Sequence, residues 1–342
     1  MFFQRVKRFI FAGLLCVSVA FPSLPAFIRP ALALNEYDLW VGGVRVTDEN
    51  KGNIVGDTIV GSVSYDPLSH TLTLSNAIIM GRKGLNMNAA IYAKSSIPTL
   101  NIDIQQDNFV FSYDELTDDA AAIYVDGSLA INGTGYLGVI GMDVAGYSSY
   151  GICAKNGTVY IRGGELDVYG GWPTNEIKTN GQVFNYINRA SAAYGIYAAG
   201  IDVSGGYTEA CGGVPVTQEF IDAHGRPYTK GIGVYGSVKL SGGTMISSGI
   251  RYAIGRSPLL RNMSAEASPH FDGSDPAAYN SSKLESYKWF KAAPTPPRPV
   301  QETSIPQTGD GAPLLLLCGV ALLSASGLAI RFALRQRGKG CL

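Results

Sequence analysis

Val159-Tyr160-Ile161-Arg162-Gly163-Gly164 is the stretch that decides the fold, because close copies of it return twice further along the chain. The copies are Ile201-Asp202-Val203-Ser204-Gly205-Gly206 and Val238-Lys239-Leu240-Ser241-Gly242-Gly243. Apolar and polar residues alternate in each unit, which predicts a short strand with one buried face. The paired glycines at the end of each unit allow a tight corner or a positive φ.

A second unit precedes several of these strands, as in Tyr150-Gly151-Ile152 and Tyr194-Gly195-Ile196-Tyr197. From Tyr150 to Gly171 the chain reads as three strands within 22 residues, which is the length of one coil of a parallel β-helix. No long amphipathic helix separates the strands, so a βαβ sheet is disfavoured. We therefore predict an all-β, right-handed parallel β-helix (a solenoid) over residues 34–260. An antiparallel β-sandwich is the alternative.

Two insertions are expected in this region, at residues 172–193 and 207–229, where the repeat spacing lengthens. Residues 261–304 are predicted to be a linker. It is proline-rich from residue 291, which favours an extended polyproline-like stalk.

Residues 1–33 have the pattern of a signal peptide. Arg5, Lys7 and Arg8 precede an apolar run that is too short to span a bilayer comfortably. Ala31 and Ala33 place small residues at the positions −3 and −1, so cleavage is expected after Ala33.

The C-terminal end contains three segments in a fixed order. Ile305-Pro306-Gln307-Thr308-Gly309 comes first, and residues 312–330 are apolar enough to span a bilayer. Residues 331–342 carry three arginines and a lysine, which would hold this end in the cytoplasm.

This order resembles the sorting signal of sortase-anchored surface proteins, in which Leu-Pro-x-Thr-Gly precedes a span and a basic tail. The resemblance implies that a sortase cysteine attacks the Thr308 carbonyl carbon and releases Gly309. Thr308 then passes to an amine of a peptidoglycan precursor, so this chain is the substrate of nucleophilic catalysis. Ile305 stands where leucine is usual, which leaves the sortase class open.

Charge and cysteine content limit the classes of partner. The whole chain holds 27 basic and 27 acidic residues, but without the two predicted end segments it holds 19 basic and 26 acidic ones. A net negative surface argues against nucleic acid, whose affinity depends on Lys and Arg at phosphates. Only Cys153 and Cys211 lie in the middle of the chain. They either form one bridge or stand apart as small buried residues.

The start of the predicted ectodomain carries a second resemblance. Tyr37-Asp38-Leu39-Trp40-Val41-Gly42-Gly43, and the run from Val63 to Ala77, are similar to the opening of cell-surface β-helix proteins of carbohydrate-binding type. The resemblance covers about residues 36–260 and rests on scaffold motifs. It therefore implies the fold more directly than an activity.

Catalysis is the first functional class to consider. Glycoside hydrolysis needs two carboxylates roughly 5–10 Å apart. Asp126, Asp143, Asp167 and Asp202 fall on different predicted coils, but each is expected to face water. We therefore predict no catalytic residue and no enzyme, and keep a polysaccharide lyase or glycoside hydrolase as the alternative.

Ligand binding is the better supported class. Tyr169, Trp172 and Tyr186 lie at or within the first insertion, where exposed rings could stack on a sugar. Tyr124, Tyr150, Tyr194 and Tyr197 belong to the repeat and are expected to form a structural ladder.

No cofactor is predicted from the sequence. Calcium is considered at Asp114, Asp118 and Asp119, because several carboxylates stand close together there. Their spacing matches no known calcium loop, so a solvated turn is the simpler interpretation.

These patterns together predict a surface protein that is attached covalently to the cell wall, after its precursor has passed through the plasma membrane. Its expected partners are a sortase, peptidoglycan, and a polysaccharide or a host or matrix surface to which it adheres. A passive structural coat is the remaining alternative.

Overall fold

The computed structural model describes residues 35–81, 89–112, 119–141, 148–171, 177–179, 182–184, 192–213 and 230–296. The predicted signal peptide, sortase motif, membrane span and basic tail all lie outside these residues. Within the described ranges, no helix is both long and apolar enough to cross a bilayer. Every strand belongs to one compact unit, Met1–Thr295.

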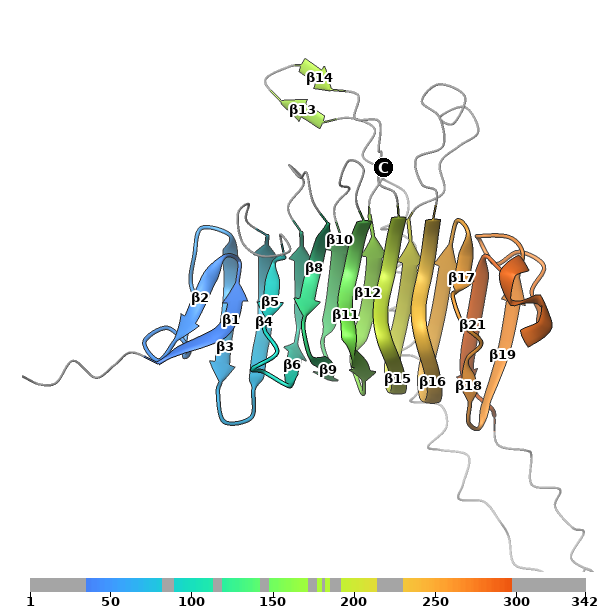
Figure 1. Cartoon of the computed structure of the whole chain (residues 1–342), viewed down its shortest axis with the longest axis horizontal. Helices are drawn as coiled ribbons and strands as arrows, with labels where there is room; N and C mark the ends of the chain where they lie inside the picture. Colours follow the sequence, from blue (N-terminus) through green and yellow to red (C-terminus); the bar gives the residue numbers. More distant parts are fainter. Residues whose placement is uncertain are drawn as a thin grey trace, which may run out of the picture. The chain divides into compact units, whose positions relative to one another are not determined.

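Three parallel ladders of strands make up most of this unit (Figure 1). The first ladder contains β5 (Ile91–Ala93), β8 (Ala120–Val125), and the beginnings of β11 (Ser148–Ile161), β15 (Ala192–Gly212) and β16 (Lys230–Gly249), followed by β17 (Tyr252–Ile254). The second contains the beginning of β4 (Thr71–Met80), β6 (Thr99–Gln105), β9 (Ser128–Gly133), later parts of β11, β15 and β16, and β18 (Leu259–Leu260).

The third ladder contains the end of β4, β7 (Asp107–Phe111), β10 (Tyr136–Gly141), β12 (Glu165–Gly170) and the ends of β15 and β16. Strands β4, β11, β15 and β16 therefore each take part in more than one ladder. In β11 and β15 the pairing register shifts at these corners, and the same strand then continues in the next ladder.

Because some strands belong to two ladders, the pairing of strands forms a closed ring. Strands β4, β6, β9, β11, β15, β12, β10 and β7 each pair in parallel with the next, and β7 pairs in parallel with β4. This closed ring of eight parallel strands has the connectivity of a barrel, and it corrects our prediction of an open β-helix solenoid. The alternative of an antiparallel sandwich is also wrong, because all these pairs are parallel.

The same ring overturns the prediction that the chain is not an enzyme. Closed barrels of eight parallel strands carry the active sites of many enzymes, so the architecture gives no ground for excluding catalysis. The fold by itself names no reaction, since function depends on the side chains placed on it.

Inward-facing aliphatic side chains fill the interior in continuous stacks. Ile123, Ile152 and Ile196 share one register position in the first ladder, and all three have 0% exposure. Ile131, Ile161 and Val203 do the same in the second ladder. No strand could bury this face alone, so stacking on its neighbours supplies the core.

The paired glycines of the sequence repeat form the corner between the second and third ladders. The second glycine of each pair has a positive φ, with values of 79° at Gly164, 74° at Gly206 and 68° at Gly243. A Cβ on Gly206 would lie 2.6 Å from the carbonyl oxygen of Gly164, which is closer than real Cβ contacts. Both the conformation and the tight stacking therefore require glycine.

Antiparallel strands cover both ends of the parallel ladders. At the N-terminal end, β1 (Glu36–Val41) pairs with β2 (Val44–Thr47) and β5, and β3 (Ile59–Asp66) pairs with β4. At the other end, β21 (Trp289–Pro294) joins β16 to β19 (Met263–Ser268), which also pairs with β20 (Ala277–Ala278). Such caps protect strand edges that would otherwise pair with other chains.

The C-terminal cap corrects the predicted linker. Phe290 is only 1% exposed and belongs to the main core, so the fold continues to β21 and includes the short 3₁₀ helix η2 (Ser281–Ser286). Strands β13 (Ile177–Thr179) and β14 (Gln182–Phe184) form a hairpin inside the first predicted insertion.

Replacing Gly206 with alanine should destabilise the protein by about 1–3 kcal/mol, the usual cost of forcing a side chain into this backbone region. Gly52→Ala is the matched control, because no heavy atom lies within 4 Å of the position its Cβ would take. Urea denaturation of both variants measures the difference. Equal stability of the two variants would contradict the proposed role of the corner glycines.

Candidate ligand-binding surface

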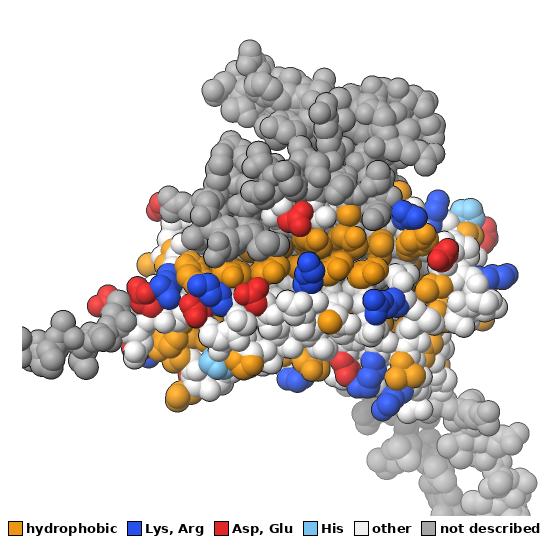
Figure 2. Space-filling view, viewed as in Figure 1, with side chains coloured by type: hydrophobic (Ala, Val, Ile, Leu, Met, Phe, Trp, Pro, Cys, Tyr) orange, Lys and Arg blue, Asp and Glu red, His pale blue; other side chains and the backbone are white. Residues whose placement is uncertain are grey.

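Two groups of aromatic side chains stand on the outside of the strand ladders. The first group, which we call the tyrosine ladder, lies on the first ladder, where the inward positions are aliphatic. It consists of Trp40, Tyr92, Tyr124, Tyr150, Tyr194, Tyr197 and Tyr235. Figure 2 shows hydrophobic side chains gathered in a band that crosses this part of β11, β15 and β16.

The rings of the tyrosine ladder pack against one another. Tyr150 and Tyr194 stack with centroids 5.3 Å apart, and Tyr197 and Tyr235 stack at 5.1 Å. The guanidinium of Arg256 lies 5.7 Å from the centre of the Tyr235 ring and forms a cation–π contact with it. The stack that the sequence indicated is therefore present, and its ring contacts stabilise neighbouring strands.

Cys153 occupies the position between Tyr124 and Tyr197 in this ladder. Its thiol is buried, and that burial raises its pKa to about 12. Cys211 lies on the third ladder beside Tyr169, and both cysteines are free. Because they stand on different ladders, the two residues form no bridge. The sequence left open whether the two cysteines form one bridge or stand apart as small buried residues. The structure shows the second arrangement.

The second group, which we call the acidic aromatic face, covers the outside of the third ladder. Its members alternate with buried Ile79, Val110, Val139 and Val168, so they point outward. They are Ile78, Met80, Asp107, Phe109, Phe111, Tyr136, Ile140, Glu165, Asp167, Tyr169 and Glu209.

Phenylalanines at the N-terminal side of this face form a small platform. Phe109 and Phe111 have nearly parallel rings, with an interplanar angle of 11° and centroids 6.1 Å apart. The ring of Phe109 leans over Gly138 on the next strand, where a Cβ would lie 2.8 Å from it. Ile78 and Met80 beside the platform are 39% and 46% exposed. An exposed apolar patch of this kind on a protein surface usually marks a binding site.

Carboxylates flank the platform. Asp167 on β12 stands directly opposite Glu209 on β15, and Glu165 follows Tyr136 in the same register. The hydroxyl of Tyr136 donates a hydrogen bond of 3.0 Å to Oδ2 of Asp167. Burial raises the pKa of Tyr136, and the negative charge of Asp167 raises it further. Burial also raises the pKa of Tyr169, with smaller contributions from Asp167 and Glu209.

Of the three predicted glycan contacts, only Tyr169 can be placed. It lies on the acidic aromatic face, next to Asp167 and Glu209. Trp172 and Tyr186 fall outside the described residues. Phe109, Phe111 and Tyr136 were not predicted as contacts from the sequence. A signal existed in Asn108-Phe109-Val110-Phe111, where a short strand carries apolar residues on both faces.

Candidate calcium and catalytic carboxylates are not brought together. Asp114, Asp118 and Asp143 lie outside the described residues, while Oδ1 of Asp119 accepts a hydrogen bond from Ser148 N at 2.7 Å. Asp202 stands on the second ladder and forms an ion pair with Lys239. In the described part of the chain, no group of three His, Cys, Asp or Glu residues could hold a metal ion.

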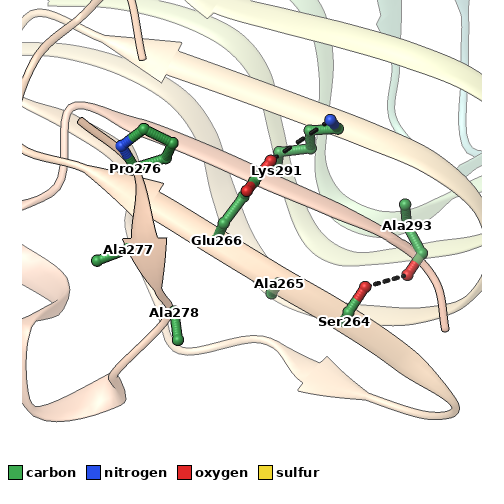
Figure 3. A pocket seen from close by; sticks show the side chains of 8 residues that line it. All are labelled: Ser264, Ala265, Glu266, Pro276, Ala277, Ala278, Lys291 and Ala293. Atoms are coloured by element: carbon green, nitrogen blue, oxygen red, sulfur yellow. Dashed lines mark hydrogen bonds and ion pairs between the residues drawn. The ribbon is translucent and has the colours of Figure 1, made fainter. Parts of the chain in front are cut away.

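A groove of about 380 Å³ lies between β19, β20 and β21 at the C-terminal cap (Figure 3). Its lining is mostly small side chains, and its charged residues, Glu266 and Lys291, form an ion pair with each other at 3.4 Å. Because these two charges satisfy each other and are about 40% exposed, the groove offers little for specific recognition.

Alkaline titration should show the burial of the tyrosine ladder. Burial raises the pKa of Tyr124 from 10.0 to about 12, and it also raises those of Tyr194 and Tyr197. Because the folded-state pKa exceeds the unfolded one, this contribution to stability is complete below pH 10 and falls as the pH approaches 12.

Phenolate absorbance and circular dichroism, followed together between these pH values, measure the effect. We expect a group of tyrosines to ionise only as the native signal is lost. Ionisation of every tyrosine near the ordinary pKa, with the fold intact, would contradict the packing described above.

No protein-family model matches this chain, and neither a curated protein nor a solved structure is significantly similar to it. The function therefore has to be argued from the surface itself.

Proposed function

We propose that this chain is a cell-wall-anchored surface protein that binds a glycan on its acidic aromatic face. The observation that carries the binding proposal is the half-buried Phe109–Phe111 platform, which has the exposed Ile78 and Met80 beside it and carboxylates on the same face. Sugar rings have an apolar C–H face that packs on aromatic rings, while their hydroxyls donate hydrogen bonds to carboxylates.

The size of the face suits an extended chain better than a single sugar. Residues of the face stand on β4, β7, β10 and β12, which are consecutive neighbours in the third ladder. Adjacent strands lie about 4.8 Å apart, so the three gaps span about 14 Å. An oligosaccharide that runs across the strands would contact several outward side chains in turn.

Support for wall attachment comes from the sequence alone. The order of Pro306, Thr308 and Gly309, an apolar span and a basic tail is that of a sortase substrate. An export signal at residues 1–33 fits the same route across the membrane. Adhesion to a polysaccharide or to a host surface would then take place outside the cell.

Mass spectrometry of wall digests tests the attachment. We expect a peptide that ends at Thr308 and carries cross-bridge residues of peptidoglycan on its carboxyl group. Thr308→Ala should abolish this product, whereas Thr303→Ala, five residues upstream of the cleavage site, should not. An intact C-terminal tail recovered from the membrane fraction would contradict the proposal.

Binding of the purified full-length chain to a panel of polysaccharides tests the ligand surface. Phe109→Ala and Phe111→Ala should each raise Kd by roughly tenfold, which corresponds to the loss of about 1.4 kcal/mol of ring contact. Tyr160→Ala is the matched control, because Tyr160 is an outward aromatic residue on the second ladder. Equal losses in all three variants would contradict the assignment, and no binding by the unaltered chain would favour a passive coat.

Cleavage of the bound glycan is a second candidate function, and it is favoured by the placement of Asp167 opposite Glu209. Neighbouring strands bring two such carboxylates to about 5 Å, a separation found in retaining glycosidases. In the same panel, new reducing ends that disappear in Asp167→Asn and Glu209→Gln would support hydrolysis. Binding without any new ends would leave the site as a binding surface.

A further inference from the structure

We propose that the C-terminal end of the strand ladders binds an anionic, phosphate-bearing polymer of the cell wall through three arginines. They are Arg251, Arg256 and Arg261, and we call the segment that holds them, residues 251–261, the arginine edge. This site is separate from the acidic aromatic face. The choice of a wall polymer as its partner rests on the wall attachment in the proposed function.

The arginine edge is the last layer of the first two ladders. It contains β17 and β18, which pair in parallel with β16. The backbone N–H of Arg251 donates a hydrogen bond to the carbonyl oxygen of Gly231, and the N–H of Arg261 donates one to the carbonyl oxygen of Leu240. Both ends of the segment are therefore bonded to the ladder framework, and all three arginines are exposed on it.

No carboxylate neutralises these arginines. Within the described part of the chain, none of the three forms an ion pair. From Lys230 to Ala265 the sequence contains five basic residues and no acidic one. Lys239 in this stretch pairs with Asp202 of β15, and Glu266, just beyond the stretch, pairs with Lys291. The positive charge of the arginine edge therefore remains available to a ligand.

Aromatic rings orient two of the guanidinium groups. The guanidinium carbon of Arg251 lies 5.1 Å from the centre of the Tyr252 ring, and that of Arg256 lies 5.7 Å from the centre of the Tyr235 ring. A guanidinium stacked on a ring keeps the N–H donors around the rim of its plane. Two of these donors can bind two oxygens of one phosphate at once, which a lysine ammonium cannot do in the same geometry.

The spacing of the arginines suits a polymer better than a small anion. β17 lies between Arg251 and Arg256, and β18 lies between Arg256 and Arg261. Because extended strands separate them, the three side chains are spread along the segment and do not surround one point. A chain with a negative charge in each repeat unit can contact all of them.

The two ends of the protein differ in charge. Residues 35–81, which contain the N-terminal cap, carry six acidic and two basic residues. The two basic ones, Arg45 and Lys51, form ion pairs with carboxylates of the same cap. Figure 2 shows Lys and Arg side chains gathered toward the C-terminal end of the face in view. A polyanion is therefore attracted to the C-terminal end and repelled from the other.

The predicted attachment places the basic end beside the wall. Thr308 is 14 residues beyond Pro294, the last residue of β21. A chain of this length spans at most about 50 Å. A protein joined to peptidoglycan at Thr308 therefore meets wall polymers at a high effective concentration, at which a few arginine–phosphate contacts suffice for binding.

Binding to isolated bacterial cell walls tests the arginine edge. The protein used is residues 34–308, the form left by the two predicted cleavages, which contains every described strand. We expect it to bind intact walls, and we expect added salt to weaken this binding. Hydrofluoric acid, which cleaves phosphodiesters and leaves peptidoglycan, should weaken it roughly tenfold or more, as should neutralising three charge-assisted contacts. The neutralised variant is Arg251→Gln, Arg256→Gln and Arg261→Gln combined.

A matched control removes three positive charges from the other end of the protein. These cations already pair with carboxylates, so binding should change by less than about twofold. The control variant is Arg45→Gln, Lys51→Gln and Lys94→Gln combined. Arg261→Gln alone is a second test, because the Arg261 side chain forms no ion pair or cation–π contact with the described residues. It should weaken wall binding while the thermal unfolding curve stays unchanged.

Equal binding by the neutralised variant and the unaltered protein would overturn the inference, and so would equal binding to intact and acid-treated walls. Tighter binding to vesicles of anionic phospholipid than to walls would also overturn it, because the partner would then be a membrane. Self-association that the neutralised variant abolishes, without any wall binding, would assign the arginines to a second copy instead. Loss of the Thr308 product in wall digests, with wall binding intact, would refute the attachment and leave this site in place.

Discussion

Parallel register is the constraint on which the rest of this protein depends. Each side chain packs against the residue at the same register position in the next strand, so side chains of similar type form columns. Inward, this places Ile123, Ile152 and Ile196 in one continuous column without exposed surface. Outward, the same rule stacks the tyrosines of the first ladder and gathers rings and carboxylates on the third. The core and the candidate site therefore lie on the inner and outer faces of the same hydrogen-bonded strands.

The two aromatic surfaces differ in how far their rings are already packed against other groups of the protein. In the tyrosine ladder, Tyr197 stacks on Tyr235, and Arg256 covers the next ring face, so the group is largely satisfied within itself. On the acidic aromatic face, Phe109 and Phe111 lie beside exposed aliphatic side chains and carboxylates. Asp167 and Glu209 stand opposite each other there on neighbouring strands. Exposed apolar side chains beside polar groups often mark a binding site, which is why we assign binding to the third ladder.

The sequence predicted the strands, their alternation and the glycine corners correctly, because these depend on local patterns. Gly163-Gly164 and its copies mark a corner wherever they occur, and the positive φ of the second glycine gives the reason. The closed ring of eight strands could not be predicted from local patterns. It depends on β4 and β15 continuing round a corner, and the sequence contains no local signal for that. The same limit explains the missed fold after residue 260, where Phe290 joins the core through long-range pairing. Tyr169 was found as a candidate from its place beside an insertion, but Phe109 and Tyr136, which lie on the same face, are far away in the sequence.

Crystallography of the full-length chain with an oligosaccharide that it binds would test the assignment of the third ladder most directly. The account predicts that the sugar lies across β7, β10 and β12, with a ring packed on Phe109. An oligosaccharide bound along the tyrosine ladder or in the groove of the C-terminal cap, with the acidic aromatic face empty, would contradict it.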